Sequence, residues 1–306
     1  MVGISGSRAH NARRVSDTWN VRQLYGRHLL QVGFVDTWLG GLLEHLRTIG
    51  LYDRALVVLT ADHGISFRPG DFFRWPTQTT FQDIMPVPLF IKAPFQARGR
   101  IDDRPTETVD ILPTLADILG IALPWTVDGH SALGPPVERS TQIFRSPDLR
   151  PVVFTDLAEA RQRAVARQHR LFGSGSFFPG LFRFGPYSAL IRKPVSEVGS
   201  AGEAPVSITL DRPDAFTNVD LEADFIPAHI TGQVTPALLN GQPVSLAVAI
   251  NGTIQAVTQP WSVPIQGRRG VWSAVVPETA FQTGRNTVEV FVVSDVVGRA
   301  TLARAR

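Results

Sequence analysis

The sequence contains no cysteine, which excludes disulfide bonds, thiolate metal sites and a cysteine nucleophile within its 306 residues. Lysine is nearly absent too: Lys92 and Lys193 are the only lysines among 30 basic residues. The arginines are scattered and the net charge is only +3, a pattern typical of a solvated surface, so nucleic-acid binding is not predicted. No stretch approaches the roughly 20 apolar residues of a membrane helix. No apolar core of a signal peptide follows the first arginines. We therefore expect neither a membrane-crossing segment nor a secretion signal in this sequence.

The most informative stretch is the run of five apolar or β-branched residues at 56–60, which predicts a strand buried on both faces. Asp62, His63 and Gly64 follow it almost at once. Ligands of open α/β sheets bind beyond the carboxyl ends of the strands, and a carboxylate beside an imidazole can hold a divalent cation. Taken alone, an Asp-His pair is more typical of a capping aspartate and a solvated histidine. The surrounding order of residues therefore has to decide.

That order resembles a known family. Residues 50–64, which read Gly-Leu-Tyr-Asp-Arg-Ala-Leu-Val-Val-Leu-Thr-Ala-Asp-His-Gly, are similar to the second metal-ligand segment of the sulfatase and alkaline phosphatase superfamily. Residues 87–94, 108–115 and 127–131 resemble later segments of the same family, in the same order. The resemblance implies that sulfate or phosphate esters are cleaved by a metal-activated Ser, Thr or formylglycine nucleophile. It also implies that Asp62 and His63 are ligands of a divalent cation.

The nucleophile segment of that family, Cys or Ser followed by x-Pro-x-Arg, has no match here. Residues 262–266 contain the serine and the proline but lack the arginine. The resemblance thus covers only residues 18–170, and we expect the chain to be the C-terminal part of a longer enzyme whose upstream part holds the nucleophile. Any membrane attachment would come from such upstream segments, and the family favours an extracytoplasmic or membrane-associated location. The alternative is a short protein that has lost activity.

The cation and the ester stay open between alternatives. Calcium prefers oxygen ligands, whereas the imidazole of His63 suits zinc or manganese better. That preference favours phosphodiester chemistry, as in the phosphoglycerol and phosphoethanolamine transferases of the superfamily. The loop at 127–131 instead resembles the sulfatases more closely. We therefore expect a metal-dependent hydrolase of sulfuric esters first, a transferase of the same superfamily second, and a non-catalytic scaffold or binding protein third.

Two further residues are candidates for substrate contacts. Arg68 lies in the loop that leaves the predicted ligand strand, and its planar guanidinium matches the oxygens of a sulfate or phosphate. His130 lies in the loop that borders the active site in the resembled family. The alternative for Arg68 is a side chain that solvates its loop, and for His130 a structural histidine.

The predicted fold class is α/β: a partial alkaline-phosphatase-like sheet with flanking helices, followed by a β-sandwich-like C-terminal domain. Residues 1–17 lack periodicity and predict a disordered segment or loop. Residues 18–170 form the sulfatase-like part, residues 171–204 the crossing between domains, and residues 205–306 an all-β accessory domain.

Particular elements follow from the pattern. A helix of about 25 residues beginning near Thr18 and ending at Gly50 is indicated by three- and four-residue spacing of apolar side chains. The positions that form this apolar stripe are Leu29, Val32, Val35, Trp38, Leu39, Leu42, Leu43 and Leu46. Near the C-terminus, the alternation through 244–250 predicts a strand, and Asn251-Gly252 predicts a tight hairpin turn after it.

Overall fold

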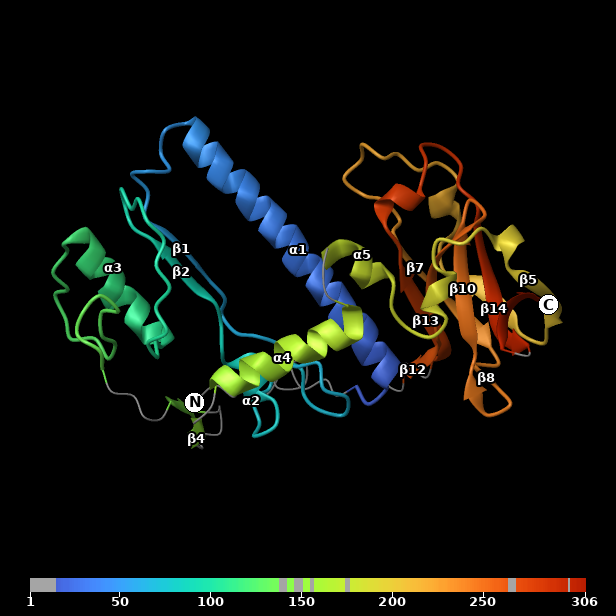
Figure 1. The fold of residues 1–306 in the computed structure, drawn as a ribbon, viewed down its shortest axis with the longest axis horizontal. Helices are drawn as coiled ribbons and strands as arrows, with labels where there is room; N and C mark the ends of the chain where they lie inside the picture. Colours follow the sequence, from blue (N-terminus) through green and yellow to red (C-terminus); the bar gives the residue numbers. More distant parts are fainter. Residues whose placement is uncertain are drawn as a thin grey trace, which may run out of the picture. The chain divides into compact units, whose positions relative to one another are not determined.

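The computed structural model describes residues 15–137, 142–145, 151–154, 157–173, 177–263, 268–296 and 298–306. The segment 1–14, where disorder or a loop is predicted, lies outside this range. The protein is a mixed α/β structure with several sheets (Figure 1). Its contacts divide the described residues into two compact units: unit 1 lies within residues 36–164, and unit 2 within residues 15–35 and 165–306.

Helix α1, Thr18–Thr48, contributes to both units because the boundary falls inside it. It is 31 residues long, and Gly50 follows in the left-handed conformation, with φ of 71°, as predicted for its end. The apolar stripe coincides with the buried side of this helix at Leu29 but not farther along. Val35 and Trp38 are 51% and 60% exposed, whereas Trp19 and Val21 in the first turns are buried. The pattern therefore predicted the helix correctly, and Leu29 of the stripe packs in a core cluster, but Val35 and Trp38 do not pack.

Unit 1 is built around a small sheet. Besides the second half of α1, its elements are β1 Val57–Thr60, α2 Phe81–Ile84, β2 Leu89–Lys92, the 3-10 turn η1 Thr108–Asp110, α3 Ile111–Leu119, β3 Gln142–Arg145, β4 Pro151–Phe154 and α4 Leu157–Phe172, which passes into unit 2. Strands β1 and β2 form a two-stranded antiparallel sheet, and β3 and β4 form another.

Strand β1 differs from its prediction in one respect. Val57, Val58 and Leu59 are half-buried and Thr60 is exposed, so the strand is not buried on both faces. Its one hydrogen-bonded neighbour among the described strands is β2, which runs antiparallel to it. A two-stranded sheet has no inner strand, and Phe90 on β2 is accordingly 62% exposed. A long apolar run indicates a strand here, but it does not reveal whether other elements pack on both faces of that strand.

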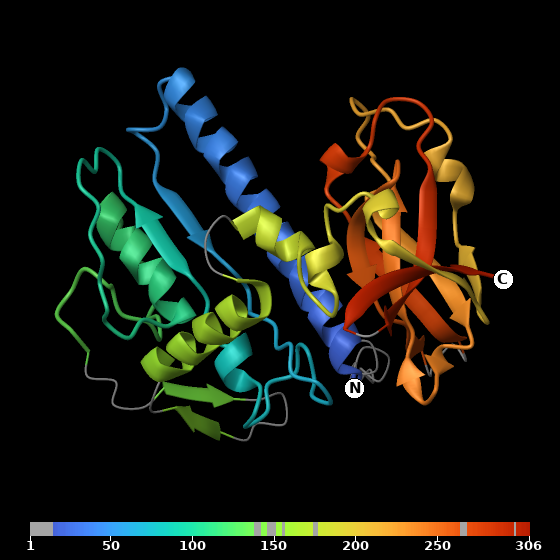
Figure 2. The ribbon, with the colours of Figure 1, turned by 45° about the vertical axis from the view of Figure 1, so that its right-hand side comes forward.

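Unit 2 contains most of the buried core. Its elements beyond the first half of α1 are α5 Phe177–Phe182, η2 Ser188–Leu190, η3 Val195–Glu197, β5 Gly199–Ala204, β6 Ser207–Leu210, η4 Pro213–Phe216, β7 His229–Thr235, β8 Leu238–Leu239, β9 Gln242–Pro243, β10 Ser245–Ile250, β11 Thr253–Thr258, β12 Trp261–Val263, β13 Arg268–Val275, η6 Glu278–Ala280, β14 Val288–Val296 and β15 Arg299–Ala305. Figure 2 shows the yellow, orange and red strands that make up its larger sheets.

Two sheets of unit 2 share one core. One has the strand order β11-β10-β14-β15-β5 and the other β12-β13-β7-β6. Leu246 and Val248 of β10 belong to the same buried cluster as Trp272 of β13 and Val234 of β7. Ala247 and Ala249, on the opposite face of β10, join a second cluster. The alternation through 244–250 thus predicted the strand, and the hairpin at Asn251-Gly252 is present, with φ of 50° and 78°.

The compact units group the chain in their own way. Residues 18–35, which belong to the predicted sulfatase-like part, lie in unit 2 together with the strands. Much of the expected crossing segment 171–204 is also built into unit 2, because β5 pairs in parallel with β15 and Leu190 and Ile191 are buried in the second cluster. The Gly- and Pro-rich composition suggested a linker, but its apolar residues bury themselves against the sheet.

Candidate functional site

The predicted metal ligands lie on the irregular segment that follows β1. Asp62 and His63 are two and three residues beyond its last residue, Thr60. The backbone N–H of His63 donates to Oδ1 of Asp62 at 2.8 Å, which fixes the carboxylate. The side chain of Asp62 is 87% exposed and that of His63 is 39% exposed. Both groups are therefore accessible to a ligand from solvent.

The orientation of His63 fits a metal ligand. Its Nδ1 lies 2.7 Å from the carbonyl oxygen of Gly64. A carbonyl can only accept, so Nδ1 carries a proton, and in the neutral imidazole the lone pair is then on Nε2. Metal-binding histidines are commonly held in this way by a carbonyl or carboxylate on the other nitrogen. The backbone beside the ring thus selects the tautomer that can bind a cation.

The separation of the two donors also fits. Nε2 of His63 lies 3.6 Å from Oδ2 of Asp62. Two ligands held about 2.1 Å from one tetrahedral cation are about 3.4 Å apart. The pair therefore matches two corners of one coordination sphere. The described residues supply no third ligand: they contain no group of three or more His, Cys, Asp or Glu side chains that could hold a metal ion.

Arg68 is engaged by a carboxylate within the protein. Its Nε donates to Oδ2 of Asp83 at 2.7 Å and its Nη2 lies 3.4 Å from Oδ1. Asp83 raises the pKa of the Arg68 guanidinium by hydrogen bonding, against the opposing effect of burial. The arginine side chain is still 43% exposed. The structure thus gives Arg68 an internal partner that the sequence did not reveal.

His130 lies in the loop that follows α3. Its side chain is exposed, while its backbone N–H donates to Oδ1 of Asp110 at 2.8 Å. Asp110 is 3% exposed and also accepts from the N–H of Glu107 at 2.8 Å. Gly129 lies so close to this turn that a Cβ there would be 2.0 Å from the carbonyl oxygen of Val109. The hydrogen bond from His130 to Asp110 and the close approach of Gly129 therefore hold this loop against the start of α3.

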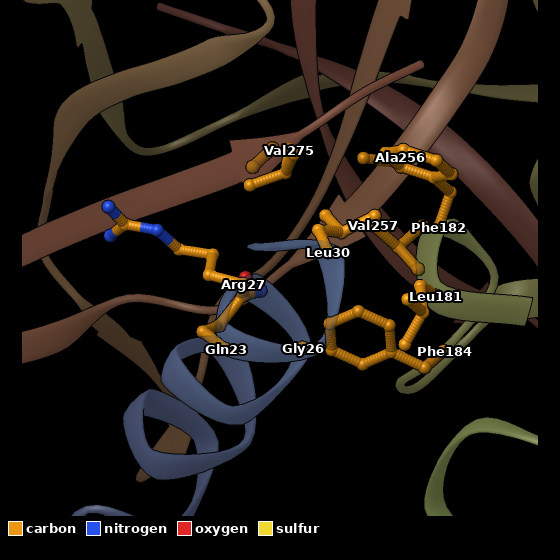
Figure 3. Close-up of a pocket in the computed structure, with 11 residues that line it drawn as sticks. Gln23, Gly26, Arg27, Leu30, Leu181, Phe182, Phe184, Ala256, Val257 and Val275 are labelled. Carbon is orange, nitrogen blue, oxygen red and sulfur yellow. The ribbon is translucent and has the colours of Figure 1, made fainter. Parts of the chain in front are cut away.

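A small hollow in unit 2 contains none of the predicted site residues. Its walls come from α1, from α5 and the residues after it, and from β11 and β13, and include Arg27, Leu181, Phe184 and Val257 (Figure 3). In this view the guanidinium of Arg27 points away from Leu181 and Phe184. Among the residues that line the hollow, Arg27 is charged and most of the others are apolar. The lining therefore offers no set of groups for acid, base or nucleophilic chemistry. We therefore place the candidate site at Asp62 and His63.

Comparison with known proteins bears on that assignment. The family model described as Sulfatase matches residues 5–121, which include Asp62, His63, Arg68 and Asp83. These residues belong to the sulfatase and alkaline phosphatase superfamily. The expected relationship is confirmed for this part of the chain.

Individual members of the superfamily match the same region. The choline-sulfatase of Rhizobium meliloti (strain 1021) is 34% identical over 116 residues, which are 37% of this chain and 22% of that protein. The multifunctional alkaline phosphatase superfamily protein PehA of Trinickia caryophylli is 28% identical over 145 residues, 45% of this chain and 28% of that protein. Arylsulfatase K of Bos taurus is 34% identical over 113 residues, 36% of this chain and 19% of that protein. The chain thus spans about a fifth to a quarter of the length of these curated relatives. No solved structure matches it.

Two carboxylates of the sulfatase-like region have partners that the sequence did not predict: Asp83 was not named, and Asp110 was predicted only as a cap of the helix at 108–119. Asp83 binds Arg68 and Ser66, and Asp110 binds the backbone before α3 and the loop at His130. The capping position of Asp110 was a usable signal, but its second bond spans 20 residues. Asp83 gives no such signal because its partners lie 15 and 17 residues away in an irregular loop.

Proposed function

We propose that this chain supplies the late metal-ligand segment of a metal-dependent hydrolase of sulfuric esters. The observation that supports this most directly is the pair Asp62 and His63, whose donor atoms Oδ2 and Nε2 are 3.6 Å apart within the Sulfatase-matched region. The named sulfatases among the relatives support the choice of a sulfuric ester. The names choline-sulfatase and arylsulfatase K describe those proteins. For this chain we propose only that the substrate is a sulfuric ester.

In this proposal Asp62 and His63 hold one divalent cation: calcium, manganese or zinc. Bound there, such a cation would stabilise charge on the ester oxygens and on the attacking group. Asp62 contributes an anionic oxygen, and His63 contributes Nε2 because Gly64 holds the proton on Nδ1. Arg68 would contact the ester through N–H groups not engaged by Asp83, and the exposed imidazole of His130 would border the substrate.

The nucleophile is assigned to polypeptide outside this sequence, since no Cys or Ser followed by x-Pro-x-Arg occurs in it. We also infer an extracytoplasmic or membrane-associated setting from the family. Among the described helices, none combines the length and the apolar character needed to cross a membrane. The two larger sheets of unit 2 are interpreted as a β-sandwich-like accessory module, because their facing sides share one buried cluster.

Calorimetric titration with Mn²⁺, Zn²⁺ and Ca²⁺ tests the metal site. The wild-type chain is compared with the double variant Asp62→Ala, His63→Ala and with Asp103→Ala, an exposed aspartate of the same unit that serves as the matched control. We expect saturable binding of at least one cation in the wild type and the control, and its loss in the double variant. Equal binding by all three proteins would remove the basis of the proposal.

A second function, phosphodiester hydrolysis or phosphoglycerol or phosphoethanolamine transfer, is favoured by one observation. His63 presents a nitrogen donor, which suits zinc or manganese better than calcium. The similarity to PehA, a multifunctional member of the superfamily, agrees with this alternative. Steady-state assays with the 4-nitrophenyl esters of sulfate, phosphate and phenylphosphonate, run on the chain joined to an upstream sulfatase-like segment, would separate the two activities.

A third candidate is a non-catalytic scaffold or binding protein. The exposure of the Asp62 side chain, 87%, and the absence of a third ligand from the described residues favour it. The metal titration distinguishes this candidate as well, because a scaffold gives the same heats for the wild type and the double variant.

A further inference from the structure

The segment that carries Asp62 and His63 has little regular structure of its own. Residues 61–67 belong to no helix or strand. Their position is nevertheless defined, because the N–H of Gly64 donates to the carbonyl oxygen of Ile84 at 2.6 Å. A Cβ at position 64 would lie 2.4 Å from the carbonyl oxygen of Asp83. The glycine after His63 therefore lies directly against the backbone of α2.

A single carboxylate holds the residues that follow. Oδ2 of Asp83 accepts from Oγ of Ser66 at 2.8 Å and from Nε of Arg68 at 2.7 Å, and Nη2 of Arg68 reaches Oδ1 at 3.4 Å. Ser66 is fully buried, and the side chain of Asp83 is only 15% exposed. A charge-assisted fork in such a setting is stronger and more directional than an exposed ion pair. The Asp83 carboxylate thus fixes Ser66 and Arg68, and the adjacent carbonyl of Ile84 fixes Gly64.

We propose that Asp83 is a positioning residue for the metal-ligand pair: through its hydrogen bonds to Ser66 and Arg68, and beside the Ile84 carbonyl that accepts from Gly64, it holds Asp62 and His63 in the arrangement that binds a cation. Arg68 gains a second role, as the partner that keeps the Asp83 carboxylate in place. This inference rests on the proposed function, since it assumes that the pair binds a divalent cation. The geometry that carries it, however, consists of contacts present without the cation.

The chemistry explains why such support is needed. A metal site loses roughly 10- to 100-fold in affinity when groups behind its ligands are removed, because the ligands must then be ordered during binding. Here the carbonyl of Gly64 fixes the His63 ring, so displacement of Gly64 displaces the ring as well. Asp83 does not have to touch the cation to change its affinity.

Two measurements on the full chain test this. The first is Mn²⁺ affinity by calorimetry, and the second is amide hydrogen exchange of Gly64 in the absence of metal. Asp83→Asn and the milder variants Ser66→Ala and Arg68→Lys are compared with Arg74→Lys, an exposed arginine in the same loop. Thermal unfolding shows that each variant is folded. We expect Asp83→Asn and Arg68→Lys to weaken Mn²⁺ binding about 10- to 100-fold and to speed Gly64 exchange at least about tenfold, with a smaller change for Ser66→Ala and none for Arg74→Lys.

The outcomes are distinguishable. Wild-type affinity and wild-type Gly64 exchange in folded Asp83→Asn would overturn the inference. Lost affinity with unchanged Gly64 exchange would make Asp83 a metal ligand and would also overturn it. If the wild type binds no Mn²⁺, the proposed function fails, and the inference fails with it. Faster Gly64 exchange in Asp83→Asn would then show only that the contacts order the loop.

Discussion

The indole nitrogen of Trp19 lies 3.3 Å from the hydroxyl oxygen of Thr258, a residue 239 positions later in the chain. Nε2 of Gln23 donates to the same oxygen at 3.3 Å, and Thr258 in turn donates to the carbonyl oxygen of Ser273 at 2.7 Å. Thr258 is fully buried. One hydroxyl therefore joins the first turns of α1 to two strands of unit 2.

Removing that hydroxyl is expected to destabilise unit 2. Thr258→Val keeps the shape of the side chain but leaves the N–H groups of Trp19 and Gln23 without their acceptor, at a cost of about 1–3 kcal/mol. Thr283→Val, at an exposed position of the same unit, serves as the control and is expected to change stability by no more than about 0.5 kcal/mol. Urea unfolding followed by tryptophan fluorescence measures both. Equal midpoints for the two variants would contradict a structural role for this hydroxyl.

The buried residues that precede β6 lead to a second prediction. A chain of residues 186–306 retains Leu190, Ile191 and strand β5, whereas a chain of residues 205–306 lacks them. The shorter chain exposes the second cluster and the edge of β15, so we expect it to be the less stable of the two and the more prone to aggregation. Circular dichroism during heating and light scattering compare them. A shorter chain as stable as the longer one would restore the boundary expected at residue 205.

Asp110 is expected to be essential for the loop at His130. Asp110→Asn places an amide NH₂ group where the carboxylate accepts from the N–H groups of Glu107 and His130, and should cost about 1–3 kcal/mol. Asp103→Asn, at an exposed position of the same unit, should be nearly neutral. Thermal unfolding gives the difference in stability, and proteolysis between α3 and residue 137 reports whether the loop is released. Resistance equal to that of the wild type would argue against this role.

His229 predicts how the stability of unit 2 depends on pH. Desolvation of the imidazole, and then the positive charges of Arg27 and Arg212, lower its pKa to about 4 from a usual value near 6.5, although the residue as a whole is exposed. Between these values the unfolded chain binds a proton that the folded chain does not, so stability falls as the pH is lowered from about 6.5 to about 4. Above about 6.5 this contribution is constant. In His229→Gln, the dependence of the urea midpoint on pH between 4 and 8 should decrease by the equivalent of up to about one bound proton. An unchanged slope in His229→Gln would contradict the prediction.

The local pattern predicted some elements well and others only in outline. Leu246, Val248 and Ile250 alternate because one face of β10 meets the opposing sheet, and Asn251-Gly252 tolerates the positive φ values of the turn. The strand and the turn could be predicted because each depends on a few neighbouring residues. Helix α1 was found for the same reason, but Trp38 and Val35 show that spacing reveals a stripe without revealing what covers it.

The candidate site was also predicted only in part. Asp62 and His63 follow an apolar strand and resemble a family segment, so their positions could be read from the sequence. The partner of Arg68 could not be read, because Asp83 lies 15 residues away across an irregular loop that contains Pro69 and Pro76. The placement of the first turns of α1 in unit 2 could not be read for a related reason. The bond between Trp19 and Thr258 joins distant parts of the chain, and no local composition indicates it.

The distribution of tryptophan between the two units has a spectroscopic consequence. Trp38 and Trp125, in unit 1, are 60% and 62% exposed, whereas Trp19 and Trp272, in unit 2, are buried. Water-exposed indoles emit at longer wavelength and are accessible to a soluble quencher such as iodide, and buried indoles are shielded from it. The protein thus carries intrinsic optical probes: the quenchable emission reports events near α1 and the loop after α3, and the shielded emission reports the integrity of the sheets.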